Sequence, residues 1–495
     1  MQATRQATSP QDSASGTASG AEGESISADI CVIGAGSGGL SVAAAAAAFG
    51  RKVVLIERHK MGGDCLNYGC VPSKAMLAAG KRAQAMRTAA PFGIAAIDPE
   101  IDMRAVHDHV HSVIAAIAPN DSAERFTGLG VRVILGAARF VSRSTVAVGE
   151  YRIKARRFVV ATGSTPLVPP IPGLDSVPYF TNETIFDNQE RLHDLIIIGG
   201  GPIGMELAQA HRRLGSRVTV IEAAKALSKD DPELAKVVLD ELTQEGIALH
   251  EGTTVERVEG GLGRVRVHVA AGEVKKVIEG THLLLAVGRK PTTADLGLEA
   301  AGIRYDKRGI KVNAGLRTSN RRVYAIGDVA GGLQFTHVAN YHAGIVIRRA
   351  LFRVPAKVDT SIIPWVTFTD PELAHVGLAE AEAKKAAGAI NVLRWPYHEN
   401  DRAQAERQTV GQIKVVTAKN GKILGVTIVG AEAGELIQMW ALAISQKMNI
   451  KAMLGWVSPY PTLSEINKRV AYRYYATTPS SPLVRWIIGF LAKFG

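Results

Sequence analysis

Short, unbroken runs of apolar residues predict buried strands in this chain, and the first run opens a strand–turn–helix–strand unit. Residues 28–33 (Ala-Asp-Ile-Cys-Val-Ile) are mostly apolar, which is typical of a parallel strand buried on both faces. The turn at 34–39 (Gly-Ala-Gly-Ser-Gly-Gly) follows, and then an alanine-rich stretch predicts a helix through Ala48. Residues 53–56 predict a second buried strand, which ends at Glu57.

The same unit recurs further along the chain. A strand at 195–198 leads into a glycine-rich turn at 199–204 and a helix to Leu214. A strand at 218–221 then ends at Glu222. The glycines at 34, 36, 39 and 50 and the glutamate at 57 each have a counterpart 165 residues later, at 199, 201, 204, 215 and 222. This constant displacement indicates an internal duplication, which predicts two similar α/β units with parallel sheets.

The pattern changes after about residue 361. Strands are expected at 411–417 and 422–429, and helices at 433–447 and 462–474. Strands grouped together and followed by helices predict a separate α+β domain after the two α/β units.

Composition narrows the class of protein. The 495 residues suggest about three domains. The net charge of +12 favours anionic partners, but the basic residues are scattered, so no nucleic-acid partner is expected. No stretch reaches the roughly 18 apolar residues of a membrane-spanning helix. Three cysteines are too few for a disulfide-stapled secreted protein, and with no export signal we expect a cytoplasmic location.

The two glycine-rich turns have the pattern that binds a dinucleotide. The first glycine permits a tight turn, the second lets the backbone approach the pyrophosphate, and the third packs the helix on the strand. The acidic residue after the second strand accepts hydrogen bonds from a ribose. The predicted binding residues are Gly34, Gly36, Gly39 and Glu57 in the first unit and Gly199, Gly201, Gly204 and Glu222 in the second. Two dinucleotides on one chain imply electron transfer between them.

Two cysteines follow the first unit, in the segment Gly62-Gly-Asp-Cys65-Leu-Asn-Tyr-Gly-Cys70-Val-Pro-Ser-Lys74. Thiols at this spacing can close a small disulfide if the segment is wound at the start of a helix, whose N-terminus also lowers a thiol pKa. An accidental pair and a partial metal site are the alternatives. The third cysteine, Cys31, lies within the first predicted strand as a buried apolar residue, so no metal site is expected.

These motifs closely resemble the signature of the class I pyridine nucleotide–disulfide oxidoreductases, a family that includes dihydrolipoamide dehydrogenase, glutathione reductase and mercuric reductase. The resemblance extends from residue 28 to residue 478. It includes the further segments Val159-Val-Ala-Thr162-Gly163, Ala286-Val-Gly288-Arg289-Lys-Pro291 and Val323-Tyr-Ala-Ile-Gly327-Asp328. It implies FAD at the first dinucleotide site, NAD(P)H at the second, and a homodimer whose last domain completes the partner subunit's active site.

The resemblance also implies a division of the chain: an α/β protein with two Rossmann-like dinucleotide-binding domains and a C-terminal α+β dimerisation domain. The expected segments are a disordered leader at 1–27, an FAD-binding domain at 28–163 and 289–355, an NAD(P)-binding domain at 164–288, a dimerisation domain at 361–478 and an amphipathic tail at 479–495.

Roles for single residues follow from the resemblance. Cys70 would face the flavin, and Cys65 would be the interchange thiol that meets the substrate. Lys74 and Glu206 match a pair near the flavin and the nicotinamide. Further cofactor-binding positions are Asp328 for the flavin ribityl chain, the segment 336–339 with Ala339 for the pyrimidine edge, and the motif residues Thr162, Gly163 and Gly288.

One position departs from the family's common pattern. Disulfide reductases end with a His-Pro…Glu element in which the histidine acts as base, whereas this chain has Tyr460, followed by Pro461, together with Glu465. Tyrosine, with an ordinary pKa of ~10, is a poor base at neutral pH. Mercuric reductases also have tyrosine there, but they carry a further cysteine pair near the C-terminus, and no cysteine follows Cys70 here. His375 and His398 are weaker candidates for a substitute base.

The electron acceptor therefore stays open at this point. The leading interpretation is a dithiol or disulfide substrate, as in dihydrolipoamide dehydrogenase. A metal ion or a quinone is the alternative, and a subunit docked to a larger complex or a membrane is another. NADH is expected in preference to NADPH, because Glu222 would repel a 2′-phosphate, although Arg217 and Lys225 lie nearby. Beyond Pro482 the sequence resembles an interfacial helix, which predicts weak attachment to anionic membranes or packing on the dimer.

Overall fold

The computed structural model describes residues 24–476 and 478–494. Most of the expected leader, 1–27, therefore lies outside the described residues. Strand β1 (Ser25–Ile33) begins inside that segment, so the first strand starts earlier than the sequence predicted. The physical reason is strand pairing, because Ser25 lies opposite Arg152 in a parallel ladder.

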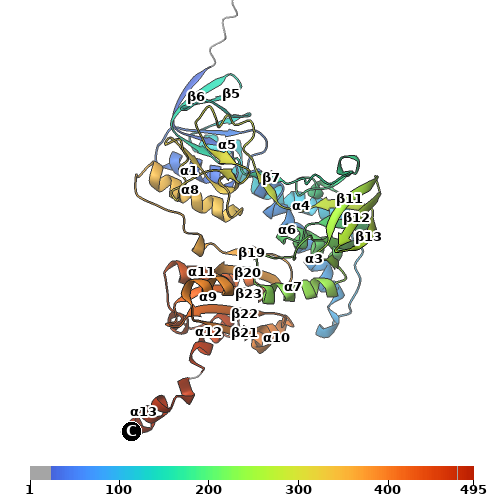
Figure 1. Cartoon of the computed structure of the whole chain (residues 1–495), viewed down its shortest axis with the longest axis vertical. Coiled ribbons are helices and arrows are strands. Elements are labelled where there is room, and N and C mark those ends of the chain that lie inside the picture. The colour runs from blue at the N-terminus through green and yellow to red at the C-terminus, as the bar shows by residue number, and fades with distance from the viewer. Residues whose placement is uncertain (1–23, 477, 495) are drawn as a thin grey trace, which may run out of the picture.

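The first unit is built around a seven-stranded sheet with the order β3-β2-β1-β6-β5-β4 and with β18 paired to β6. Strands β5 and β6 lie at the top of the view in Figure 1. Strand β18 and helix α8 follow the second unit in sequence, so this domain is assembled from two separate parts of the chain. Its strands are β1, β2 (Val53–Glu57), β3 (Val131–Leu135), β4 (Arg139–Ser142), β5 (Thr145–Val148), β6 (Tyr151–Val160) and β18 (Val323–Ala325). Its helices are α1 (Ser37–Ala48), α2 (Gly63–Asn67), α3 (Cys70–Arg87), α4 (Met103–Ile117), α5 (Ala123–Gly128) and α8 (Thr336–Ala350).

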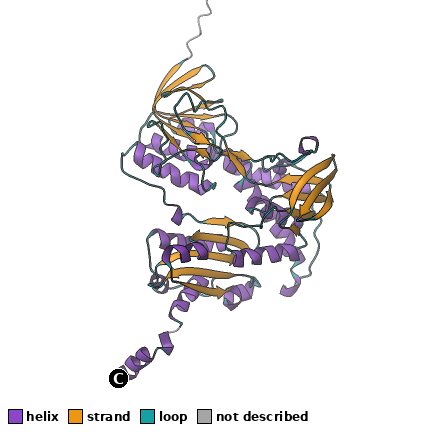
Figure 2. Ribbon diagram, viewed as in Figure 1, coloured by secondary structure: helices purple, strands orange, loops and turns teal. Residues whose placement is uncertain are grey.

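The second unit has a smaller parallel sheet with the order β10-β9-β8-β14. A separate antiparallel sheet of β11, β12 and β13 lies at its outer edge (Figure 2). The elements are β8 (Asp194–Ile198), α6 (Pro202–Arg213), β9 (Arg217–Ile221), α7 (Pro232–Gln244), β10 (Ala248–His250), β11 (Thr254–Gly261), β12 (Arg264–Ala271), β13 (Val274–Gly280) and β14 (His282–Leu285). The chain passes between the first two units through the antiparallel pair β7 (Ser164–Pro166) and β15 (Arg289–Pro291).

The duplication is visible in the glycine-rich turns. Gly34 and Gly199 both have positive φ, +104° and +114°, which favours glycine. A Cβ on Gly39 would lie 1.9 Å from the carbonyl oxygen of Gly34. The equivalent Cβ on Gly204 would lie 2.0 Å from the carbonyl oxygen of Gly199. In both units the third glycine thus lets the helix pack directly against the turn that precedes it.

The third unit is a five-stranded antiparallel sheet with the order β19-β20-β23-β22-β21. Its strands are β19 (Trp365–Thr367), β20 (Glu372–Gly377), β21 (Ile390–Pro396), β22 (Gln412–Ala418) and β23 (Ile423–Gly430). Its helices are α9 (Glu380–Ala387), α10 (Asp401–Glu406), α11 (Ala433–Ser445) and α12 (Glu465–Tyr472). The remaining elements are the short pair β16 (Tyr305–Asp306) and β17 (Gly309–Ile310) and the C-terminal helix α13 (Pro482–Leu491).

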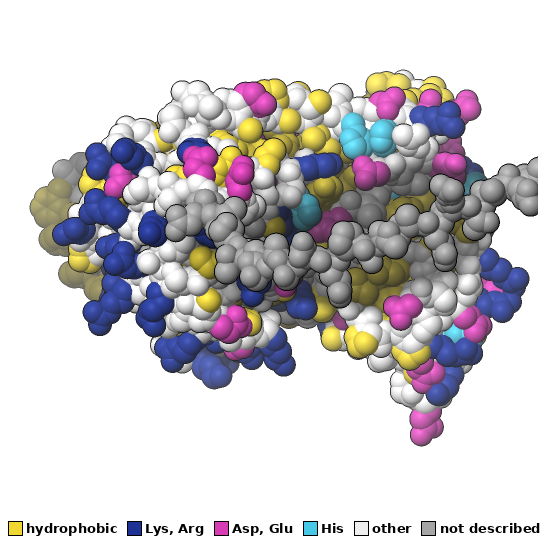
Figure 3. Space-filling model, turned by 90° about the horizontal axis from the view of Figure 1, so that it is seen from above, with side chains coloured by type: hydrophobic (Ala, Val, Ile, Leu, Met, Phe, Trp, Pro, Cys, Tyr) yellow, Lys and Arg dark blue, Asp and Glu magenta, His cyan; other side chains and the backbone are white. Residues whose placement is uncertain are grey.

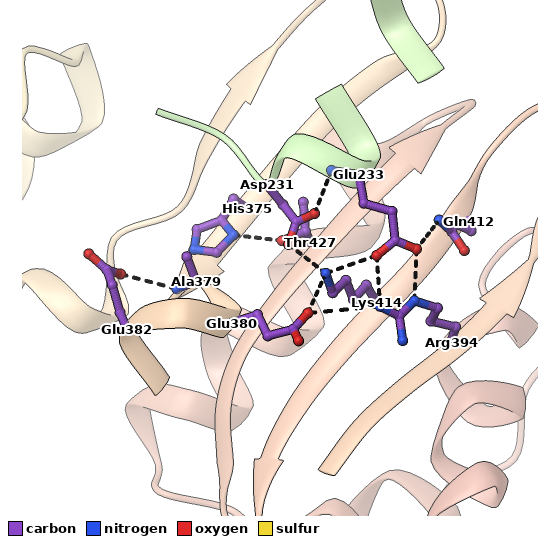
Figure 4. A network of polar contacts seen from close by, with 10 residues as sticks. All are labelled: Asp231, Glu233, His375, Ala379, Glu380, Glu382, Arg394, Gln412, Lys414 and Thr427. Carbon is purple, nitrogen blue, oxygen red and sulfur yellow. Dashed lines mark hydrogen bonds and ion pairs between the residues drawn. The ribbon is translucent and has the colours of Figure 1, made fainter. Parts of the chain in front are cut away.

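A buried ion network fastens the second unit to the third (Figure 4). The Nζ of Lys414, on β22, lies 2.8 Å from Asp231, 3.0 Å from Glu233 and 2.6 Å from Glu380. Asp231 and Glu233 stand at the start of α7, so the contact joins the two units. Arg394 forms two hydrogen bonds with Glu233, and these bonds, together with those from Lys414, lower the pKa of Glu233 to about 2 against the effect of burial.

The charged side chains on the surface and the lengths of the helices bear on which partners the protein could bind. On the face seen in Figure 3, Lys and Arg side chains are spread around the periphery with Asp and Glu side chains between them. Within residues 24–476 and 478–494, no helix is both long and apolar enough to cross a lipid bilayer.

Candidate active site

Cys65 and Cys70 lie on two consecutive helices of the first unit. Cys65 is within α2, and Cys70 is the first residue of α3, where the helix N-terminus favours a negative charge. Both are free thiols in the structure. The Sγ of Cys70 lies 3.4 Å from the hydroxyl oxygen of Thr336, at the start of α8.

The two thiols differ in their readiness to lose a proton. A hydrogen bond from Cys65, and then one from Thr336 and the charge of Lys74, lower the pKa of Cys70 to about 6, although burial opposes them. The same hydrogen bond to Cys70, together with burial, raises the pKa of Cys65. This order of pKa values favours the thiolate on Cys70 and the proton on Cys65.

Lys74 and Glu206 form an ion pair in which the Nζ lies 2.7 Å from Oε2. Lys74 is on α3, one turn after Cys70, and Glu206 is on α6 of the second unit. The other oxygen of Glu206 accepts a hydrogen bond of 2.9 Å from the backbone N–H of Phe368. The Lys74 ammonium lies 4.4 Å from the centre of the Phe368 ring. Phe368 belongs to the third unit, so all three units meet at this pair. Sequence reasoning missed Phe368.

Glu57 and Glu222 occupy equivalent positions in the two copies. Glu57 accepts hydrogen bonds from the backbone N–H groups of Ala35 and His59, at 2.7 and 2.9 Å. Glu222 accepts hydrogen bonds from the backbone N–H groups of Gly200 and Ala224, at 2.7 and 2.8 Å. Each carboxylate is thus tied to its own glycine-rich turn, and each lines the cavity described below.

Asp328 lies beside the joint between the first two units. The hydroxyl of Ser164 donates to it at 2.5 Å, and burial raises its pKa. Arg289 donates to Ser164 at 2.7 Å and forms an ion pair of 2.9 Å with Asp64. Arg289 was not among the predicted site residues. It could have been found from the sequence, because it stands directly after Gly288 in a segment that matches a family motif.

A single cavity of about 1560 Å³ contains both glycine-rich turns and the thiols. The predicted residues that line it are Gly34, Gly36, Glu57, Cys65, Cys70, Lys74, Thr162, Gly163, Gly199, Gly201, Glu206, Glu222, Gly288, Asp328 and Ala339. Gly39 and Gly204 are not among the lining residues, in keeping with their packing role.

The lining fits two dinucleotides. A Cβ on Gly201 would meet no protein atom within 4 Å, so the bare backbone there faces open space in the cavity. Helices α1 and α6 begin directly after Gly36 and Gly201, which aims their N-termini at any phosphate bound there. The volume, the paired glutamates and these helix ends are what FAD and a pyridine nucleotide require.

Cys65 also faces a second, smaller cavity of about 310 Å³, which Cys70 does not line. Thr336 and Asp121 contribute to its wall, together with apolar side chains of Leu66 and Ile117. Cys65 thus lines both cavities, whereas Cys70 lines only the large one.

Tyr460 and Glu465 lie apart from the thiols of their own chain. Neither lines the large cavity. The Tyr460 side chain is 70% exposed, and its hydroxyl donates to Asp401 at 2.9 Å, which raises the tyrosine pKa. His375 is buried in the sheet of the third unit beside Thr427 (Figure 4), and His398 does not line the cavity either.

Comparison with known proteins agrees with this geometry. A family model described as "Pyridine nucleotide-disulphide oxidoreductase" matches residues 28–343, and the family's dimerisation-domain model matches residues 363–471. The chain belongs to the pyridine nucleotide-disulphide oxidoreductase family. The predicted family and fold class are confirmed, the chain is a FAD-dependent oxidoreductase by family, and its dimerisation domain supports a homodimer.

Similar proteins include mercuric reductases, dihydrolipoyl dehydrogenases and a flavoprotein disulfide reductase. A mercuric reductase from Bacillus cereus is 36% identical over 440 residues, which cover 88% of this chain and 70% of the relative. A dihydrolipoyl dehydrogenase from Thermus scotoductus is 37% identical over 450 residues, covering 88% and 95%. Among solved structures, the Cu(II) complex of the HOCl-induced flavoprotein disulfide reductase RclA from Escherichia coli matches with a TM-score of 0.81 and 26% identity, covering 90% of this chain and 99% of that chain.

Proposed function

We propose that the protein oxidises NADH and passes the electrons through FAD and the Cys65–Cys70 pair to a thiophilic metal ion. The observation that carries the choice of acceptor is Tyr460, which stands where disulfide reductases have a histidine base and is hydrogen-bonded to a carboxylate. Reduction of a metal ion by a dithiol needs no acid to protonate a leaving thiolate. The mercuric reductase relatives and the Cu(II) complex of the structural neighbour support this class of acceptor.

The chain's residues divide the work in this proposal. When bound, FAD supplies a two-electron carrier between nicotinamide and disulfide. Gly34, Gly36 and Glu57 would hold it, and the glycines of the second turn with Glu222 would hold NADH. Lys74 and Glu206 place a balanced charge pair beside the thiols.

The thiol chemistry balances as follows. The Cys65–Cys70 disulfide takes up two electrons and one proton, which leaves the thiol on Cys65 and the thiolate on Cys70. Both sulfurs then give up these electrons to one Hg(II), or to two Cu(II) ions that become Cu(I). The disulfide forms again and the proton leaves Cys65. The smaller cavity beside Cys65 is the route by which we propose the ion arrives.

A dithiol or disulfide substrate is the second candidate, favoured by the dihydrolipoyl dehydrogenase relatives. We also propose that NADH is preferred over NADPH because of the Glu222 carboxylate, and that the enzyme works in the cytoplasm, where a free Cys65–Cys70 dithiol is chemically stable.

A steady-state screen separates the candidates. NADH oxidation by the FAD-loaded protein is followed with Hg(II), Cu(II), lipoamide, glutathione disulfide and quinones. The Cys65→Ser variant is the matched control, because it removes the interchange thiol and corrects for direct reaction of metal ions with NADH. We expect metal-ion turnover that depends on Cys65. Faster turnover of lipoamide than of either metal ion would refute the proposed acceptor.

A further inference from the structure

The C-terminal helix α13 leaves large apolar side chains in contact with solvent. None of its residues is buried, and Figure 1 shows it projecting beyond the third unit, at the end of the molecule opposite the first unit. Trp486 is 67% exposed, and Phe494, just past the helix, is 73% exposed. A soluble protein rarely leaves so many apolar side chains together on its surface unless they contact a partner.

The helix is apolar around most of its circumference. Arg485, Gly489 and Lys493 are spaced four residues apart, so they share one narrow stripe. Next to that stripe runs an aromatic ridge, in which Trp486 and Phe490 have ring centres 5.9 Å apart. Phe490 and Phe494 continue the ridge at 5.1 Å. A tryptophan beside basic residues is typical of side chains that sit at the boundary between lipid tails and headgroups.

All the charged side chains after Glu465 are basic. No Asp or Glu follows Glu465 in the sequence. The basic residues after it are Lys468, Arg469, Arg473, Arg485 and Lys493. Such a segment is complementary to an anionic lipid surface, to which each basic residue adds attraction.

The length of the helix restricts how it could meet a bilayer. Ten residues form a helix about 15 Å long, whereas the hydrocarbon core is about 30 Å thick. The helix could therefore lie in the plane of the interface but could not span it. The family's dimerisation-domain model ends at residue 471, before α13 begins, so α13 is outside the segment that the family uses for pairing.

We propose that α13 is an in-plane anchor that attaches this enzyme to an anionic lipid surface. Trp486, Phe490 and the neighbouring aliphatic side chains would enter the apolar layer, while Arg485 and Lys493 would remain among the headgroups. The anchor lies at the far end of the third unit, so the large cavity between the units stays open to solvent.

Co-sedimentation of the FAD-loaded full-length protein with vesicles tests the anchor. Phosphatidylcholine vesicles with and without phosphatidylglycerol are compared at low and high salt. We expect binding to the anionic vesicles, and deletion of residues 482–495 should weaken it by about tenfold or more. The double variant Arg485→Glu/Lys493→Glu should lose most of the dependence on phosphatidylglycerol. Trp486→Ser/Phe490→Ser should weaken binding to anionic vesicles at both salt concentrations.

Leu262→Ser provides the matched control, because Leu262 is 92% exposed but lies in the turn between β11 and β12 of the second unit. Its binding to vesicles should equal that of the unaltered protein. Reduction of the flavin by NADH should proceed at the same rate with and without residues 482–495. Equal sedimentation of the truncated and full-length proteins would refute the anchor. The anchor would also be refuted if the full-length protein does not bind vesicles but loses its dimeric state in sedimentation velocity when α13 is deleted. In that case the helix would contact a second copy of the chain and not a membrane.

Discussion

The Nζ of Lys74 lies 2.7 Å from Oε2 of Glu206, and this ion pair connects the helix that carries Cys70 to the second unit. The Glu206 side chain is 7% exposed, so its charge is weakly screened by solvent. Lys74 lowers the pKa of Cys70, whereas Glu206 raises it. The thiolate is thus balanced between two opposite charges from different domains.

Opposite shifts are therefore expected from the two halves of the pair. Lys74→Met should raise the pKa of Cys70, and Glu206→Gln should lower it, because each removes one of the opposing charges. The thiolate is followed by its long-wavelength absorbance with the flavin during a pH titration of the NADH-reduced protein. Each variant also leaves one partly buried group without its partner, which should cost about 1–3 kcal/mol of unfolding free energy. Shifts of both variants in the same direction would contradict this account.

Thr336 should contribute to the same thiolate through its hydroxyl. Thr336→Val removes the hydrogen bond to Cys70 and should raise the thiol pKa, while Thr336→Ser keeps a hydroxyl and should restore it. Rates of alkylation by iodoacetamide across pH measure the pKa directly. An unchanged profile in the valine variant would mean that this contact does not stabilise the thiolate.

Tyr460 should limit the use of disulfide substrates. A positioned base contributes about 10²–10⁴-fold where proton transfer limits the rate. Tyr460→His should raise turnover of lipoamide or glutathione disulfide and give it a pH dependence near the imidazole pKa of ~6.5, with Glu465 available to orient the ring. Tyr460→Phe should leave those substrates almost unaffected. Efficient lipoamide turnover by the unaltered protein, unchanged in Tyr460→His, would show that the missing histidine is not limiting.

Glu222 should set the choice of nicotinamide cofactor. Glu222→Ala removes the carboxylate that would accept from a ribose hydroxyl and repel a 2′-phosphate. We expect the ratio of kcat/KM for NADPH to that for NADH to rise about tenfold or more, because Lys225, which also lines the cavity, remains to attract the phosphate. Arg217 cannot help, because it lies at the opposite end of β9 and is paired with Asp194. Glu57→Ala is a useful comparison, since the equivalent change in the first unit should weaken FAD retention instead. A higher kcat/KM for NADPH in the unaltered protein would overturn the expected preference.

His211 should make the second unit sensitive to acid. Burial, and then the nearby charge of His282, lower its pKa to about 4, and neither ring nitrogen has a hydrogen-bond partner in the described part of the chain. In the unfolded chain this histidine has an ordinary pKa of about 6.5, so the unfolded state takes up the proton at a higher pH than the folded state. The free energy of unfolding is therefore highest above pH 6.5 and decreases as the pH drops towards 4. This decrease in the free energy of unfolding should approach about 3 kcal/mol. Urea unfolding at several pH values should show a smaller loss in His211→Leu, and equal losses would exclude His211 as the cause.

Local sequence patterns were sufficient for the parts of the fold that depend on local geometry. Except at the start of β1, the strands and helices around the two glycine-rich turns were placed within a residue or two, because Gly34 and Gly199 require positive φ and Gly39 and Gly204 require a close backbone contact. Phe368 could not be found in this way, because its role depends on how separate domains meet and a single sequence carries little information on that. Arg289 stood in a matching motif, but its partners Ser164 and Asp64 lie far from it along the chain. The early start of β1 was missed for the same reason, since its pairing with β6 joins distant segments.

The ion network around Lys414 has a mechanical consequence. It fastens α7 to the third unit, and the hydrogen bond from the backbone N–H of Phe368 to Glu206 is a second contact between these two units. On its other side the second unit packs against the first, where α3 contacts α6 and Lys74 pairs with Glu206. The second unit is therefore held from two directions, so a movement of its sheet would shift contacts with both neighbouring units.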